Sequence, residues 1–558
     1  MNTTPLPPSL MSAVSVLDSL VRAGMRHILV SPGSRSAPLA YAVAALDAAG
    51  VVTSHVRIDE RSAAFTALGL AKATGAPVGV VTTSGTAVGE LVPAVMEAYH
   101  SGLPLAILSA DRPPRLRGTG ANQTTQQPGM LTNFVRAEVD LTDYPEREPG
   151  KQTEAFSQAL ATLCGRDAQR WEAASSLPVG PVHLNLAFDT PLTPAPAHAE
   201  LLQRWARRLA EAPEAAPLAQ PTEDLADWLG VNTAQLPEVK TVVVAGDGAG
   251  EVAQRFAAKH HLPLLAEPSS GARFSNVAIE AYRQVLAGEL GEQIEKVVLF
   301  GHPTLSRPVT ALLDAADKEQ LYYAERPAPW FTPGRLKRRA VNSLTELAEL
   351  AGRGSAQWLD AWQQAGRQAR AEHLAAVRDY RETGVATGRA AGLSLALQAW
   401  ETAQVRGETL LCGSSNLIRD LDLIAPSSQR APVVLASRGL AGIDGTLAVA
   451  SGVSLASATR DGGQATPVRV LCGDLTFLHD VSSLNIGPLE LKPRVVVDVL
   501  DDRGGGIFGT LEHGKLGQDP GFAEAVHRYF TTPHAVEIER LVEGFSAENG
   551  FTVNVTRA

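Results

Sequence analysis

Two aspartates in the last fifth of the chain each close a β-rich run. Asp474 ends TPVRVLCGD, and Asp502, 28 residues later, ends RVVVDVLDD. Gly504 follows with a backbone carbonyl that no side chain covers. Parallel strands bring their carboxyl ends to one edge of a sheet, so these oxygen donors are expected to meet there. Mg²⁺ prefers such donors and shares them with phosphate oxygens, and Mn²⁺ accepts the same ligands. The sequence therefore predicts a metal and phosphate site at Asp474, Asp502 and Gly504.

The elements that would position these residues recur along the whole chain. β-rich runs alternate with Ala- and Leu-rich helical stretches, which is typical of parallel sheets covered by helices. The runs lie at 26–36, 55–62, 77–88, 103–113, 181–188, 240–251, 262–271, 296–304, 320–327, 408–416, 431–439, 466–474 and 494–502, and a further strand, FTVNV, is predicted at 551–555. The fold class expected is α/β, with three consecutive doubly wound, mainly parallel-sheet domains.

Composition places the domain boundaries and limits the class of protein. Domains are expected at 1–192, 223–352 and 353–558, with a Pro- and Ala-rich linker at 193–222 around a short helix. The 558 residues are 45% hydrophobic, and no apolar run approaches the roughly 20 residues that cross a bilayer. Three scattered cysteines form no disulfide framework, and a net charge of −10 argues against a nucleic-acid surface. The first residues show no secretory signal, so a cytoplasmic location is expected.

The GDL of the first run and the DDRGG of the second resemble a motif of thiamine-diphosphate enzymes. That motif is a GDG triplet followed by paired asparagines. Here Leu475 stands in place of the third glycine, and Asp501 and Asp502 stand in place of the asparagines. The resemblance implies thiamine diphosphate and Mg²⁺ as cofactors. Asp502 still offers an oxygen, but its extra charge bears on which metal is preferred.

The same resemblance implies a glutamate from a different sheet, and Glu60 in HVRIDERS stands at a predicted strand-to-helix turn. A carboxylic acid bonded to the aminopyrimidine ring promotes the imino form that takes the proton from the thiazolium carbon. An apolar surround would raise the pKa of Glu60 towards that task. The structural alternative is an acid in the first turn of a helix, beside Arg61.

Four longer strings narrow the resemblance: SPGSRSAPL (31–39), ADRPPRLRGTGANQTTQQ (110–127), GSSNLIRD (413–420) and ASRGLAGIDG (436–445). They resemble the thiamine-diphosphate synthases of menaquinone biosynthesis over both outer domains. The resemblance implies decarboxylation of 2-oxoglutarate and conjugate addition of the succinyl-semialdehyde carbanion to isochorismate. It also implies a homodimer or dimer of dimers with the active site between chains, in which Glu60 is catalytic.

Both implied substrates are dicarboxylates, so an acidic protein needs several arginines at one cavity. Each arginine taken singly is more often solvated or salt-bridged. The residues matched to isochorismate are Ser34, Arg35, Arg112, Asn122, Gln123 and Arg307. Those matched to 2-oxoglutarate are Ser415, Arg419 and Arg438, and Leu511 is expected to face the substrate.

The cofactor residues follow from the same match. Ile443 resembles the bulky residue that holds the cofactor bent, although ordinary core packing is the commoner fate of an isoleucine. Backbone N–H groups near Leu475 and Thr476 are expected to bind the diphosphate. The full set of expected cofactor contacts is Glu60, Ile443, Gly473, Asp474, Leu475, Thr476, Ile507 and Phe508.

Two other functions are weighed against this one. The first is another thiamine-diphosphate decarboxylase or synthase, acting on pyruvate or an acyl-coenzyme A. The second is a nucleotide-binding regulatory protein that uses GDGAGE (246–251), which follows a predicted strand and precedes a helix. That segment lacks the third glycine of a dinucleotide-binding loop, which favours a tight structural turn. The thirteen histidines form no HExxH pattern, so zinc is not expected.

Overall fold

The first domain of the computed structural model contains a parallel six-stranded sheet in the order β2-β1-β3-β4-β6-β5. The structure describes residues 5–557 except 143–148, 167–177, 213–222, 274, 325–327, 329, 331–337 and 428–430. The strands are β1 (His27–Val30), β2 (Thr53–Val56), β3 (Val78–Thr82), β4 (Leu105–Asp111), β5 (Ala137–Thr142) and β6 (Val182–Ala187). The helices are α1 (Pro8–Arg22), α2 (Ala37–Ala48), α3 (Glu60–Thr74), α4 (Thr86–Gly89), α5 (Val92–Ser101), α6 (Pro149–Leu163) and α7 (Ala199–Ala210).

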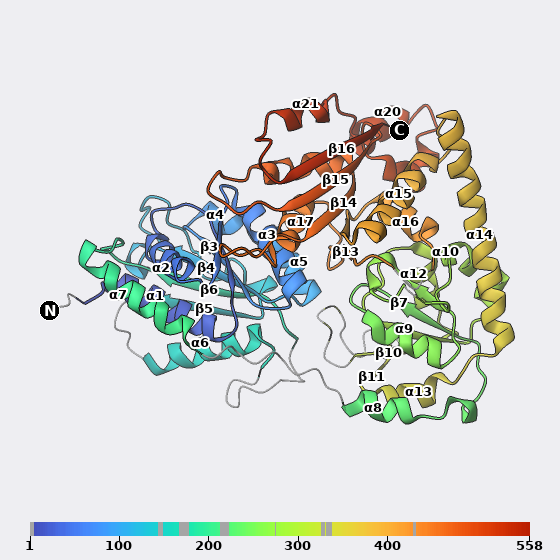
Figure 1. Ribbon diagram of the computed structural model, residues 1–558, viewed down its shortest axis with the longest axis horizontal. Coiled ribbons are helices and arrows are strands. Elements are labelled where there is room, and N and C mark those ends of the chain that lie inside the picture. The colour runs from blue at the N-terminus through green and yellow to red at the C-terminus, as the bar shows by residue number, and fades with distance from the viewer. Residues whose placement is uncertain are drawn as a thin grey trace.

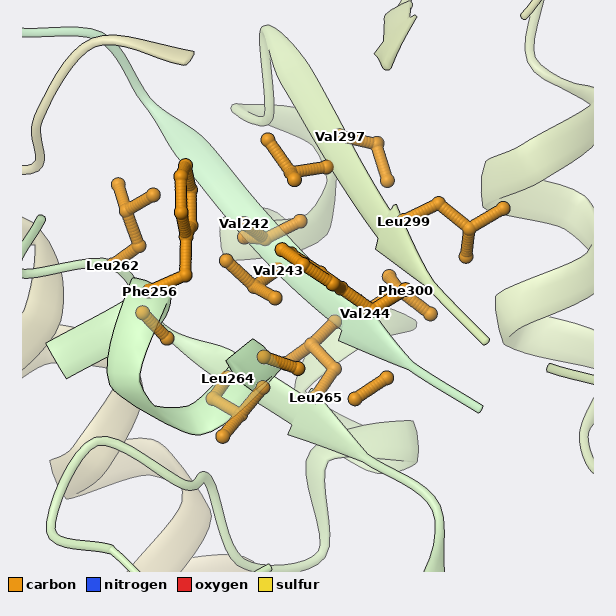
Figure 2. Close-up of a cluster of buried hydrophobic side chains, with 14 of the residues drawn as sticks. Val242, Val243, Val244, Phe256, Leu262, Leu264, Leu265, Val297, Leu299 and Phe300 are labelled. Atoms are coloured by element: carbon orange, nitrogen blue, oxygen red, sulfur yellow. The ribbon is translucent and has the colours of Figure 1, made fainter. Parts of the chain in front are cut away.

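The middle domain has a five-stranded parallel sheet in the order β11-β10-β9-β7-β8. Figure 2 shows its core, where Phe256 packs with its ring centroid 5.5 Å from that of Phe300. The strands are β7 (Thr241–Ala245), β8 (Leu264–Ala266), β9 (Lys296–Phe300), β10 (Glu319–Tyr323) and β11 (Arg339–Val341). The helices are α8 (Glu223–Gly230), α9 (Gly250–Lys259), α10 (Tyr282–Leu286), α11 (Glu289–Glu292), α12 (Arg307–Asp314) and α13 (Leu344–Ala351).

The third domain repeats the plan with a parallel sheet in the order β13-β12-β14-β15-β16. Its strands are β12 (Thr409–Cys412), β13 (Val434–Ala436), β14 (Pro467–Gly473), β15 (Arg494–Asp501) and β16 (Phe551–Arg557). Its helices are α14 (Ala356–Thr383), α15 (Ala390–Arg406), α16 (Asn416–Ile424), α17 (Thr446–Leu455), α18 (Asp474–His479), α19 (Glu512–Leu516), α20 (Ala523–Val526) and α21 (Ile538–Glu543). Within the described residues, no helix has both the length and the apolarity to span a membrane.

The predicted fold class is confirmed by these three parallel sheets. Strands β5 and β11 were not predicted. The sequence of β5, AEVDLT, carries two acids, and β11 has only three residues, RAV, so neither gives a strong β signal. The chain is long enough for three cores, and each sheet is covered by its own helices (Figure 1).

Two helices pack in ways that the predicted domain division did not anticipate. Helix α7 falls within the predicted 193–222 linker, and its Trp205 packs in the core of the first domain. Helix α14 starts in the core of the middle domain at Trp358 and ends in the core of the third domain at Val377. Figure 1 shows α14 running along one side of both domains. The boundaries at 192, 223 and 353 stay predictions.

The first and third domains share one hydrophobic core, in which α3 packs against α17 (Figure 1). Glycines allow this close approach. A Cβ atom at Gly69 would overlap the carbonyl oxygen of Val449, and one at Gly452 would overlap that of Thr66. Every residue of α17 is buried, because α3 covers one side and the third sheet covers the other. The two helix backbones therefore lie as close as glycine permits.

We expect Gly452→Ala to lower the free energy of unfolding by about 1–3 kcal/mol, since the added methyl group must push α3 away from α17. Thermal unfolding followed by circular dichroism measures the change. Gly89→Ala is the matched control, because Gly89 is exposed at the end of α4 and a Cβ there meets no atom within 4 Å. Equal unfolding midpoints for Gly452→Ala and the wild type would contradict the close packing.

Candidate active site

A cavity of about 180 Å³ lies at the carboxyl edge of the third sheet. The loops after β12, β14 and β15 line it, together with Ile443 from the loop before α17. The sequence-predicted residues that line it are Ser415, Ile443, Gly473, Asp474, Leu475, Thr476, Asp502, Gly504, Ile507 and Phe508. Residues that lie far apart in the chain thus meet at one place, as the parallel topology requires.

Asp474 is the most tightly held of these side chains. Its Oδ1 accepts a hydrogen bond from Leu475 N at 2.6 Å, and its Oδ2 accepts one from Gly504 N at 2.8 Å. His534 Nε2 lies 3.0 Å from the same Oδ2. Burial raises the pKa of Asp474, and the hydrogen bonds from His534 and the two amides lower it. The carboxylate has a fixed direction before any ligand arrives.

Asp502 is the second acid of the cavity. Burial, and next the charge of Asp474, raise the pKa of Asp502 to about 6, while the nearby guanidinium of Arg389 lowers it. A Cβ atom at Gly506 would overlap Asp502 Oδ2, so any other residue there would displace this carboxylate from its observed position. A buried acid and a half-buried acid whose ionisation costs more because of burial form a site that a divalent cation would stabilise.

The neighbouring Asp501 points elsewhere. Its Oδ1 accepts a hydrogen bond from Arg503 N at 3.1 Å and lies 3.8 Å from His534 Nε2. Ligand atoms of Asp474, Asp501 and His534 lie within 4.8 Å of one another. Since successive side chains of a strand alternate in direction, Asp502 and not Asp501 reaches the cavity. This agrees with the choice of Asp502 as the expected ligand.

Helix α16 points its N-terminus into the cavity, and Ser414, Ser415, Asn416 and Leu417 line this end. The first backbone amides of a helix have no partner within the helix, so an anion is stabilised there. Asn416 Nδ2 is buried and has no hydrogen-bond partner among the described residues. Ser414 Oγ donates to Ser437 O at 2.7 Å, which ties this turn to the loop that carries Arg438.

This donor set fits the implied cofactors. The two carboxylates and the Gly504 carbonyl are the oxygen ligands that Mg²⁺ takes. The α16 N-terminus and the unpaired Asn416 amide supply donors for a diphosphate. The residues that would hold the metal and the diphosphate thus line one cavity.

The first-domain candidates gather at the carboxyl edge of their own sheet, after β1, β3 and β4. Arg112 donates to Ser84 Oγ and, at 2.9 Å, to Gln123 O. Gln123 Nε2 donates to Ser84 O at 2.9 Å. Gln123 has a φ of 55°, a left-handed conformation, so its backbone is held in place by these contacts.

The remaining first-domain candidates flank this group. Arg35 Nη1 donates to Phe188 O at 2.9 Å, and Ser34 and Asn122 are exposed. A Cβ atom at Gly33 would overlap the side chain of Thr83, so the loop after β1 lies directly on the loop after β3. The isochorismate candidates of this domain therefore share one face.

Glu60 is the first residue of α3, and it lies outside the cavity of its own chain. The N-cap is Asp59, whose carboxylate accepts from Arg61 N at 2.9 Å and from Ser62 N at 3.2 Å. Arg61 Nη2 donates to His479 O at 3.0 Å, and this oxygen lies at the far end of α18 from Asp474. Asp59 fills the N-cap position, and Glu60 stands as an acid in the first turn of α3, where the helix dipole favours a negative charge.

Four further candidates lie outside the cavity: Arg307, Arg419, Arg438 and the half-buried Leu511. Arg307 is 71% exposed and forms an ion pair with Glu512 at 2.6 Å, so it joins the middle domain to the segment after Leu511. Arg438 is buried and donates to Thr304 Oγ1 at 2.7 Å. Arg419, on α16 below the cavity, donates to Ser415 O at 2.7 Å. Burial, and next the charge of Arg438, lower the pKa of Arg419.

Three residues of the site were missed by sequence reasoning. Arg389 lines the cavity and pairs with Asp420, Asn416 offers its unpaired amide, and His534 contacts Asp474. Asn416 follows Ser415 directly in GSSNLIRD and was available from that motif. Arg389 and His534 belong to no motif, and only the fold brings them to the cavity.

The segment 246–251 forms a tight turn against the middle-domain loop that follows β9. A Cβ atom at Gly246 would overlap Pro303 N, and Asp247 N donates to His302 O at 3.2 Å. Asp247 also pairs with Lys72 of the first domain at 3.5 Å. Asp247 thus packs between two domains, while Gly248 and Gly250 of the same turn line a cavity of about 450 Å³.

Comparisons with known proteins agree with this geometry. Residues 12–130 match the family model described as the thiamine pyrophosphate enzyme, N-terminal TPP binding domain. A protein of Arthrobacter sp. (strain FB24), named 2-succinyl-5-enolpyruvyl-6-hydroxy-3-cyclohexene-1-carboxylate synthase, is 46% identical over 97% of this chain and 85% of its own length. The chain belongs to this synthase family. Proteins of the same name from Renibacterium salmoninarum and Paenarthrobacter aurescens are 44% and 46% identical, over 97% and 96% of the chain and 89% and 88% of their own lengths.

Membership of the synthase family confirms the resemblance stated from the motifs. The chain is a thiamine-diphosphate-dependent enzyme. The family model matches the first domain, whereas the cavity at Asp474 lies in the third domain. Its matched first domain carries Glu60, and its third domain carries the two acids. A site built from Glu60 and the two acids would require the carboxyl edges of a first-domain sheet and a third-domain sheet to face one another.

Proposed function

We propose that the chain decarboxylates 2-oxoglutarate and adds the succinyl-semialdehyde carbanion to isochorismate, giving 2-succinyl-5-enolpyruvyl-6-hydroxy-3-cyclohexene-1-carboxylate and CO₂ in menaquinone biosynthesis. The observation that carries the proposal is the cavity that joins Asp474, Asp502 and the α16 N-terminus, in a chain whose relatives bear this name. The cytoplasmic location expected from the sequence stays a prediction.

Each wall of the cavity has a proposed task. Asp474, Asp502 and the Gly504 carbonyl hold Mg²⁺ or Mn²⁺, and the amides of α16 and of Leu475 and Thr476 hold the diphosphate. Thiamine diphosphate, when bound, supplies the thiazolium carbon that takes up a 2-oxo acid and releases CO₂. Ile443, Ile507 and Phe508 enclose this reactive part and exclude water.

The substrate anions are assigned to the arginine-bearing loops. Arg419 and Arg438 lie in the third domain beside Ser415, and we assign them to the carboxylates of 2-oxoglutarate. Arg35, Arg112 and Gln123, with Ser34 and Asn122, form the isochorismate face of the first domain. Arg307, which pairs with Glu512 next to Leu511, is assigned to isochorismate as well, and Leu511 is assigned to a contact with the substrate. Planar guanidinium groups suit carboxylates because they donate two parallel hydrogen bonds that the two carboxylate oxygens accept.

We further propose a homodimer, alone or paired as a tetramer, in which Glu60 of one copy completes the site of the other. Two observations support this. Glu60 does not line the cavity of its own chain, and the residues before it expose apolar surface, with Val56 43% and Ile58 69% exposed. An apolar surface beside an unused catalytic candidate is expected to be covered by a second copy.

The decisive test of the substrates is a direct assay of the wild type with thiamine diphosphate and Mg²⁺. We expect loss of isochorismate and release of CO₂ in equal amounts, but only when 2-oxoglutarate is present. Pyruvate, which lacks the distal carboxylate, should give turnover at least about tenfold slower, since one charged hydrogen-bond pair is lost. Faster turnover of pyruvate, or of an acyl-coenzyme A acceptor, would favour a different enzyme of the same cofactor class.

A further inference from the structure

The loop at 532–537, between the π-helical turn His527–Thr531 and α21, folds over the glycine loop that follows Asp502. Gly505 N donates to Thr531 O at 2.6 Å, and a Cβ atom at Gly504 would lie 2.5 Å from the same oxygen. Arg503 fixes the far side of the loop, since it donates to Val536 O at 3.1 Å and to Glu537 at 3.0 Å. The loop is therefore anchored on both sides of His534.

The ring of His534 has a defined proton position. Val536 N–H donates to Nδ1 at 3.2 Å, so Nδ1 is an acceptor and the neutral ring carries its proton on Nε2. Nε2 lies 3.0 Å from Asp474 Oδ2 and donates to it. The side chain of His534 is only 11% exposed, so the contact is shielded from water.

Counting acceptor positions shows what this bond does to Asp474. A carboxylate has about four lone-pair positions. Oδ2 accepts from Gly504 N and from His534, which fills both of its positions, and Oδ1 accepts from Leu475 N, which fills one. One position on Oδ1 stays open. Without His534, the carboxylate would keep one open position on each oxygen and could turn between them.

We propose that His534 is a positioning residue of the metal site, which holds the Asp474 carboxylate so that Oδ1 is the oxygen offered to the metal ion. Groups that hydrogen-bond to a metal ligand tune its direction and affinity, and their loss costs about 10–100-fold in metal binding. This inference rests on the proposed metal position at Asp474 and Asp502, and it is independent of the proposed substrates.

The test measures metal binding without substrate. Mn²⁺ is titrated into protein with a fixed excess of thiamine diphosphate, and the free Mn²⁺ is read by its electron paramagnetic resonance signal. We expect His534→Leu to weaken Mn²⁺ binding by about 10–100-fold. His534→Gln should regain most of the affinity, because its amide nitrogen can donate from nearly the position of Nε2. The matched control is His527→Leu, which removes an exposed histidine of the same segment and should bind as the wild type does.

Each result decides one question. Wild-type affinity in His534→Leu would overturn the role of His534. Equal weakening in the leucine and glutamine variants would also overturn it, since that pattern indicates lost packing instead of a lost donor. If the wild type itself shows no Mn²⁺ binding that depends on thiamine diphosphate, the proposed metal site fails, and this inference fails with it.

Discussion

Glu60→Gln should slow the consumption of isochorismate by about 10²–10⁴-fold, the usual range for the loss of a general acid–base group. The amide keeps the shape and a hydrogen-bond acceptor, but it cannot hold and release a proton at the pyrimidine nitrogen. Steady-state assays with saturating cofactors measure the loss. Glu90→Gln, an exposed change at the end of α4, is the control and should retain the wild-type rate. Equal rates for Glu60→Gln and the wild type would remove Glu60 from its role.

Mixing two inactive variants tests where Glu60 acts. In a dimer whose sites are shared, Glu60→Gln and Asp474→Asn subunits can pair so that one site carries both changes and the other carries neither. Random exchange should then restore about a quarter of the wild-type activity. If each chain uses its own Glu60, every site in the mixture stays damaged and no activity returns. Sedimentation of each variant alone checks that it still forms dimers.

The second large effect arises because a proton and the metal ion compete for the carboxylate of Asp502. The pKa of Asp502 without metal is raised to about 6, so the acid is ionised above that pH and protonated below it. Only the ionised form binds a cation well. We therefore expect the apparent affinity for Mg²⁺ to be highest above pH 6 and to fall about tenfold for each pH unit below it.

Asp502→Asn should remove most of this pH dependence, because the amide does not titrate between pH 5 and 8. It should also weaken Mg²⁺ binding at pH 8 by about 10–100-fold, since one negative charge is lost from a half-buried site. Calorimetric titration at pH 5, 6, 7 and 8 with thiamine diphosphate present measures both effects. Asp461→Asn, an exposed change away from the cavity, is the control. An unchanged pH slope in Asp502→Asn would show that another group governs the competition.

The sequence predicted those parts of the site that lie next to strands. Asp474, Asp502 and Gly504 follow β14 and β15 directly, so the parallel topology was enough to bring them together. Ser415 and Ile443 line the same cavity, and they could be predicted because their loops belong to recognisable strings. Local sequence and the rule that ligands meet at carboxyl edges therefore predicted both the fold class and the residues that line the cavity.

What the sequence could not supply are contacts made over long distances by residues outside motifs. His534 is 60 residues from Asp474, and only the return of the chain between β15 and β16 places it there. Arg389, at the start of α15, likewise comes near Asp502 only through the packing of the third domain. Likewise, the pairing of Arg307 with Glu512 depends on how two domains pack, which no local pattern encodes.

The close packing of α3 on α17 also governs how this chain can fold. One side of α3 packs on β1, β3 and α5 of its own domain, whereas the other side is covered by α17, which follows it by more than 370 positions. Contacts between such distant segments form late, because a long loop must close first. During synthesis this side of α3 is therefore exposed to solvent until α17 has left the ribosome. The chain is expected to depend on chaperones at that stage, when its exposed helix is most prone to aggregate.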